Sequence, residues 1–168
     1  RHTTGFFRSD IDWSDFGNYL NEKYQNSDKV NVRVYACSSG QEAYTTAILL
    51  KHVFKDNAQK FLPLYASDID KTLIDNNKQN QKNGILMCGN DFERMYEHLG
   101  LNSNEAKEYF KVYSPGFVEI KPEITDSVNF ETSNILEDID SIDEKNPTII
   151  MSRNMWPYVN AWKYDEFA

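Results

Sequence analysis

The chain has 168 residues, of which 40% are hydrophobic and 14% aromatic, and this is enough apolar material for the core of one domain. The formal net charge is −8, from 18 basic against 26 acidic residues, which argues against a nucleic-acid partner because phosphate binding depends on a basic surface. No apolar run in the sequence reaches the length of a membrane span, so we expect no membrane insertion. Cys37, Cys88 and three scattered histidines form neither a disulfide framework nor a zinc motif, which favours a reducing cytoplasm and no metal site.

The first half of the chain alternates helical and strand patterns. The expected elements are a helix over Asp12–Tyr24, a strand over Val32–Tyr35, a helix from about Gln41 to Phe54, a strand that stops at Ser67-Asp68, and a helix over Lys71–Lys78. This order predicts parallel strands joined by right-handed crossovers. We therefore expect a doubly wound α/β fold with a mostly parallel sheet.

The pattern loosens between 84 and 122, which we interpret as a small inserted subdomain. It contains helical stretches at 90–100 and 104–110 and an extended stretch at 117–124 that Pro122 interrupts. Two further strands are expected at 127–132 and 147–154, and the acidic stretch 137–146 between them predicts a loop. We divide the chain into a lead-in segment and helix (1–28) and a main domain (29–168), and we expect it to be a truncated part of a longer protein.

Ligands of open α/β sheets bind beyond the carboxyl ends of the strands, where the strand order switches. After the first strand, Ser38-Ser39-Gly40 forms a small-residue turn, and the next helix offers free backbone N–H groups. A dinucleotide site would need three glycines here. The single Gly40 therefore argues against a dinucleotide and leaves room for a smaller adenosine ligand without a pyrophosphate.

Acidic and amide side chains at these strand ends have two interpretations each. Asp68 can accept hydrogen bonds from ribose hydroxyls or cap the next helix, although Asp70 is better placed as the cap. Glu42 can contact a ligand or simply interact with the helix dipole. Asn134 can face the ligand or close a turn, and Arg153 can face it or form a buried ion pair.

Five stretches in this order resemble motifs of one enzyme family: TTGFFR at 3–8, ACSSGQEAYT at 36–45, ASDID at 66–70, SNIL at 133–136 and MSRNMWPYV at 151–159. They resemble the chemotaxis receptor methyltransferases, the CheR family of S-adenosylmethionine-dependent enzymes. The resemblance implies a Rossmann-like class I methyltransferase fold. It implies S-adenosylmethionine as cofactor and S-adenosylhomocysteine as product, with glutamate side chains of chemoreceptor cytoplasmic helices as the protein substrate.

The same resemblance assigns roles to individual positions. The cofactor pocket would be lined by Thr4, Arg8, Ala36, Glu42, Asp68, Asn134 and Ile135. Arg153 and Tyr158 would lie on the acceptor side of the methyl group, with Arg8 nearby, and these three are the candidate catalytic residues.

Some positions differ from the family pattern, and they leave two alternatives open. Gln41 replaces a glutamate, Ala43 replaces a proline, and Pro157 lies just before Tyr158. The basic helical domain that precedes TTGFFR in the family is absent from this sequence. The alternatives are a non-catalytic S-adenosylmethionine-binding or receptor-binding module of the same fold, and a methyltransferase with a different acceptor.

Overall fold

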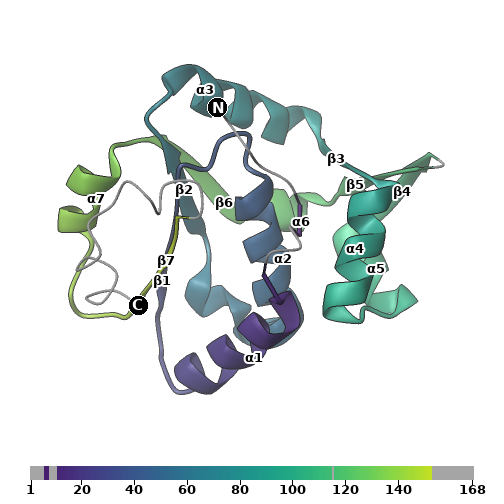
Figure 1. Cartoon of the computed structure of the whole chain (residues 1–168), viewed down its shortest axis with the longest axis horizontal. Coiled ribbons are helices and arrows are strands. Elements are labelled where there is room, and N and C mark those ends of the chain that lie inside the picture. Colours follow the sequence, from purple (N-terminus) through teal and green to yellow (C-terminus); the bar gives the residue numbers. More distant parts are fainter. Residues whose placement is uncertain (1–5, 8–10, 115, 153–168) are drawn as a thin grey trace.

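The computed structural model describes residues 6–7, 11–114 and 116–152. Its central sheet consists of β1 (Asn31–Tyr35), β2 (Leu64–Asp68), β6 (Val128–Thr132) and β7 (Thr148–Met151). All neighbouring strands are parallel, in the order β6-β2-β1-β7 (Figure 1). The chain moves outward from β1 to β2 and β6 and then returns to the other side of β1. This reversal confirms the doubly wound α/β fold and puts the switch point between β1 and β7.

Helices cover both faces of the sheet, because alternate residues of the buried strands point to opposite sides. Figure 1 shows α1 (Trp13–Tyr24) and α2 (Gln41–Phe54) on one side of the sheet and α7 (Ile135–Ser141) on the other. In β1, Val32 and Val34 belong to the main core, whereas Tyr35 packs with Ile135 and Ile139 of α7. The main core therefore lies on the α1 and α2 side, and a small second cluster lies under α7.

The bounds of the first two helices agree closely with the sequence prediction. Asp12 caps α1 by accepting from the Asp15 backbone N–H, and α2 has the predicted bounds. A short 3-10 helix, η1 (Lys55–Phe61), follows α2. Helix α3 (Lys71–Asn83) continues five residues past the predicted end at Lys78. Its last turn is anchored by Gln81, whose side-chain amide donates to two backbone carbonyl groups near the start of β6.

The segment of the chain that follows α3 and precedes β6 forms a second sheet, which is antiparallel. It contains β3 (Ile85–Cys88), β4 (Phe110–Ser114) and β5 (Phe117–Ile120), in the order β3-β5-β4, with α4 (Gly89–Leu99), α5 (Ser103–Tyr109) and α6 (Pro122–Thr125). The predicted helices at 90–100 and 104–110 are confirmed by α4 and α5. Strands β3 and β4 were not predicted, and Phe110 begins β4 instead of ending the helix.

The acidic stretch at 137–146 is not entirely a loop, so that prediction is wrong for its first half. Residues 137–141 belong to α7. The helix forms because Asn134 caps it, Glu137 and Asp138 lie in its first turn, and Ile135 and Ile139 are buried on one side. The predicted strand at 147–154 ends as β7 at Met151, and its last residues lie outside the described part of the chain.

Candidate functional site

The loop after β1 has an unusual backbone. Ala36 and Ser38 have φ angles of 51° and 51°, and Gly40 has a φ of 92°. Few residues other than glycine adopt this left-handed region, so the surrounding contacts must hold it in place. The Cys37 N–H donates to the carbonyl of Ser67 at 2.9 Å, which ties the loop to the end of β2. A side chain at Gly40 would come within 2.9 Å of the Phe130 ring, so this position also needs glycine for space.

Asp68 fixes this loop through its carboxylate at the end of β2. The carboxylate is buried, with the residue 7% exposed, and accepts from the Ser38 N–H at 3.1 Å and the Asp70 N–H at 3.0 Å. Asp70, not Asp68, caps α3, because its side chain accepts from the N–H groups of Thr72 and Leu73. Each carboxylate oxygen has more than one acceptor position. Asp68 can therefore hold the loop and still accept from a ligand's hydroxyl groups.

Asn77 supports the loop from α3, and sequence reasoning missed it. Its side-chain amide is buried and donates to the Ser38 carbonyl at 2.7 Å. The available signal was an asparagine three residues after the buried Ile74, on the inner face of the helix. Ser38 is thus held through its N–H by Asp68 and through its carbonyl by Asn77.

Glu42 and Cys37 lie buried on either side of the Gly40 turn. Glu42 is in the first turn of α2, where the helix dipole favours a negative charge. Burial, followed by the charge of Asp68, raises the pKa of the Cys37 thiol to about 12. The thiolate that a nucleophilic cysteine needs is therefore scarce at neutral pH, which favours a packing role for Cys37 over a nucleophilic one.

The segment after β6 approaches Asp68 from the other side. The Ser133 N–H donates to the backbone carbonyl of Asp68 at 3.1 Å. The next residue, Asn134, caps α7 by accepting from the Leu136 N–H at 2.9 Å, and Ile135 is buried under this helix. The side-chain oxygen of Asn134 thus has a local role, although it caps a helix and does not close a turn.

Ser152 is a second residue that sequence reasoning missed. It follows β7, and because Met151 pairs with Val34, it lies beside the end of β1 at the switch point. The residue is 1% exposed, and its hydroxyl finds no hydrogen-bond partner within the described part of the chain. Buried polar groups are normally paired, so this hydroxyl suits a bound polar ligand.

Five of the predicted cofactor residues therefore lie at the carboxyl edge of the central sheet. Ala36 and Glu42 follow β1, Asp68 ends β2, and Asn134 and Ile135 follow β6. The remaining predicted site residues, Thr4, Arg8, Arg153 and Tyr158, lie outside the described residues. Within 6–7, 11–114 and 116–152, no group of three acidic, histidine or cysteine side chains could hold a metal ion.

Comparison with known families identifies the family of the chain and its cofactor. Residues 2–167 match the model of the CheR methyltransferase, SAM binding domain. The chain belongs to the CheR methyltransferase family. S-adenosylmethionine is accordingly its cofactor.

Two curated relatives support the assignment. The chain is 26% identical over 129 residues to "Chemotaxis protein methyltransferase Cher2" of Pseudomonas putida, an alignment that covers 75% of this chain and 42% of the relative. It is 25% identical over 129 residues to "Chemotaxis protein methyltransferase 1" of Pseudomonas aeruginosa, covering 75% of this chain and 43% of the relative. The chain thus spans less than half the length of the curated relatives it matches.

The polar groups at the carboxyl edge fit the chemistry of S-adenosylmethionine. The Asp68 carboxylate has acceptor positions that hydroxyl groups of a ligand can use, and two buried acids, Glu42 and Asp68, suit a ligand that carries a sulfonium and an ammonium charge. The same two acids would repel a pyrophosphate. The hydroxyl of Ser152 adds a donor at the switch point.

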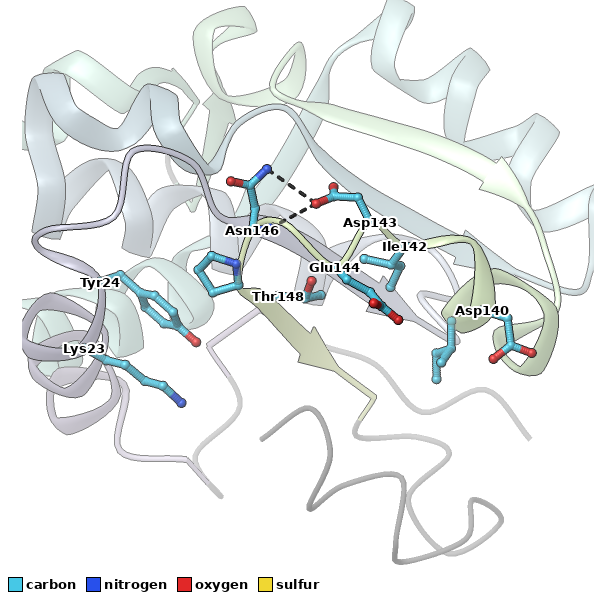
Figure 2. A pocket seen from close by; sticks show the side chains of 10 residues that line it. Lys23, Tyr24, Asp140, Ile142, Asp143, Glu144, Asn146 and Thr148 are labelled. Carbon is cyan, nitrogen blue, oxygen red and sulfur yellow. Dashed lines mark hydrogen bonds between the residues drawn. The ribbon is translucent and has the colours of Figure 1, made fainter.

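A cavity of about 470 Å³ lies at the opposite edge of the sheet (Figure 2). Thr148, the first residue of β7, lines it together with Lys23 and Tyr24 at the end of α1. Asp143 shapes its rim by accepting from the side chain of Asn31 and the backbone N–H of Asn146. Ser152 follows the other end of β7, so this cavity lies at the edge of the sheet away from the predicted cofactor residues.

No helix within the described ranges is both long and apolar enough to cross a lipid bilayer.

Proposed function

We propose that this protein transfers the methyl group of S-adenosylmethionine to glutamate carboxylates of chemoreceptor cytoplasmic helices. The observation that carries the proposal is the buried Asp68 carboxylate, which is bonded to the strained loop after β1 and lies at the strand end where a ribose would bind. Membership of the CheR family and the names of the two relatives support the acceptor class.

The site residues divide into two groups in this proposal. Asp68 accepts from the ribose hydroxyls, Glu42 accepts from polar donors of the cofactor, and Asn134 with Ile135 brackets the adenine. Ala36, Thr4 and Arg8 complete the pocket. Bound S-adenosylmethionine supplies an electrophilic methyl group on a positively charged sulfur.

Arg153 and Tyr158 orient the accepting glutamate, and Arg8 lies close to the reacting groups. A carboxylate is already ionised at neutral pH, so the protein needs no general base. Attack of the carboxylate on the sulfonium methyl cancels two opposite charges. Correct alignment in a site that excludes water therefore provides much of the acceleration.

Isothermal titration calorimetry with S-adenosylhomocysteine tests the first half of this proposal. We expect binding, with no heat from a nicotinamide dinucleotide. Transfer of labelled methyl groups from S-adenosylmethionine to receptor-containing membranes tests the second half. Arg153→Ala should lower that transfer about a hundredfold, as the loss of one preorganised catalytic donor does, while affinity for the product changes far less.

The outcomes separate the three candidate functions. Binding of S-adenosylhomocysteine without transfer to any receptor glutamate would favour a non-catalytic binding module. Transfer to another protein, with receptor membranes unlabelled, would indicate a different acceptor. If neither the cofactor nor its product binds, the proposed function is wrong.

A further inference from the structure

A hydrogen bond links the end of β1 to α7 on the face of the sheet away from α2. The Tyr35 hydroxyl donates to the Oδ2 atom of Asp138. Tyr35 is 2% exposed, and its ring packs against Ile135 and Ile139 of the same helix. Burial and the Asp138 carboxylate raise the pKa of Tyr35, so its hydroxyl stays protonated and able to donate.

Arg33 extends this link to β2. Its Nε atom lies 3.6 Å from the same Oδ2 atom of Asp138, and its guanidinium group lies 4.5 Å from the centre of the Tyr65 ring. Tyr65 belongs to β2, three residues before Asp68. The Asp138 carboxylate is thus held by two side chains of β1, one of which stacks on β2.

The link spans the two segments that flank the predicted adenosine site. Tyr35 directly precedes Ala36, where the loop after β1 begins. Asp138 lies about one helical turn after Asn134 and Ile135. The contact between Tyr35 and Asp138 therefore fixes the spacing between the loop and the start of α7.

The bond between Tyr35 and Asp138 is one of the side-chain contacts that hold the short helix α7 against the sheet. The helix has seven residues, which is too short to be stable on its own, and its buried cluster is separate from the main core. Its packing on the sheet therefore relies on contacts made by its side chains, among them those of Ile135, Ile139 and Asp138. A change at Asp138 should move Asn134 and Ile135 without unfolding the central sheet.

We propose that Tyr35 and Asp138 are positioning residues that set cofactor affinity by holding the adenosine-binding start of α7 against the loop after β1. This inference rests on the proposed function, because it needs adenosine to bind between these segments. It concerns residues that act through Ala36, Asn134 and Ile135 and that do not themselves touch the reacting atoms.

The test compares four variants: Tyr35→Phe, Asp138→Ala, Asp138→Asn and, as a control of equal charge change, Glu137→Ala. Glu137 is the exposed neighbour of Asp138 in the first turn of α7. Calorimetry measures the Kd of S-adenosylhomocysteine and of adenosine for each variant, at a temperature well below its Tm. Steady-state kinetics measures KM for S-adenosylmethionine and kcat.

Tyr35→Phe and Asp138→Ala should each raise both Kd values about tenfold, close to the loss of one hydrogen bond to a charged group. KM should rise by a similar factor while kcat changes less than threefold. Asp138→Asn should recover most of the affinity, because its amide oxygen still accepts from Tyr35. Glu137→Ala should bind like the wild type.

Three results would overturn the inference. Lower Tm values with both Kd values unchanged would show that the link only stabilises the fold. Weaker binding of S-adenosylhomocysteine with normal binding of adenosine would place the effect at the wrong end of the cofactor. An equal loss of affinity in Glu137→Ala would show that the effect comes from the charge of the helix and not from the bond to Tyr35. A wild type that binds neither ligand would instead refute the proposed function.

Discussion

Asp68 combines a structural and a ligand-binding role in one carboxylate. Replacement by alanine removes the acceptor for the N–H groups of Ser38 and Asp70, which are bonded to it now. Buried donors without partners cost about 1 to 3 kcal/mol each. We therefore expect Asp68→Ala to lower the free energy of unfolding by about 2 to 4 kcal/mol and to raise the Kd of S-adenosylhomocysteine more than tenfold.

Asp70→Ala is the matched control for this prediction. It removes the cap of α3, which costs about 1 kcal/mol, and should leave cofactor affinity unchanged. Urea denaturation and calorimetry on the two variants measure stability and affinity separately. If Asp68→Ala lowers only stability, its carboxylate serves the loop and not the cofactor.

The residues that could be predicted from sequence are those at the ends of strands. Asp68 ends an apolar strand and Glu42 lies in the first turn of the helix after another, so their place at the carboxyl edge follows from the α/β order alone. Asn77 could not be recognised in the same way, because its role depends on a carbonyl 39 residues earlier in the chain. The partners Tyr35 and Asp138 are 103 residues apart, and no local pattern connects them.

Some elements could be predicted from their local pattern, and others could not. Helix α2 begins after Gly40 and buries most of its residues, so its bounds could be predicted. The last turns of α3 are polar and are fixed by Gln81, a contact that periodicity does not reveal. Strands β3 and β4 are short, with side chains such as Leu86 and Val112 exposed, so they lack a clear alternating pattern.

One ionic cluster joins α2 and η1 to α5. The Oε2 atom of Glu105 lies 2.9 Å from the Nδ1 atom of His52 and 3.0 Å from the Nζ atom of Lys55. The hydrogen bond from Lys55 holds the pKa of Glu105 below its ordinary value. A carboxyl group whose pKa is lower in the folded state stabilises the fold at pH values above its pKa in the unfolded chain. That stability is lost as the pH falls through the pKa of the folded state.

Glu105→Gln should therefore lower Tm by about 1 to 3 °C at neutral pH, the scale of a partly exposed ion pair. The difference from the wild type should shrink toward zero as the pH falls through the lowered pKa of Glu105, because the wild-type carboxylate is then also protonated. Thermal melts across this pH range measure it. Glu108→Gln, an exposed position on the same helix, should show no such trend, and a constant difference for Glu105→Gln would contradict the ionic explanation.

At the scale of the whole molecule, the antiparallel sheet and the central sheet share one core. Met95 of α4 and Val118 of β5 belong to the same buried cluster as Trp13 of α1 and Leu49 of α2. Figure 1 shows α4 and α5 on the side of the molecule where α2 also lies. The segment between 84 and 122 remains a predicted insertion in the chain order, but its apolar side chains do not form a core of their own.

This shared core predicts that both sheets unfold together. Met95 is fully buried, so Met95→Ala should lower the free energy of unfolding by about 2 to 5 kcal/mol. The unfolding curve in urea should remain a single transition, with far-UV circular dichroism and aromatic fluorescence giving the same midpoint. Val112→Ala, at a position in β4 that is 77% exposed, should leave the midpoint almost unchanged.

A separate early transition in Met95→Ala, with the remaining signal unfolding at the wild-type midpoint, would show that the antiparallel sheet is an independent unit. In the single-transition case, damage to the antiparallel sheet reduces the population that can bind S-adenosylhomocysteine, even though Asp68 and its loop lie on a different sheet.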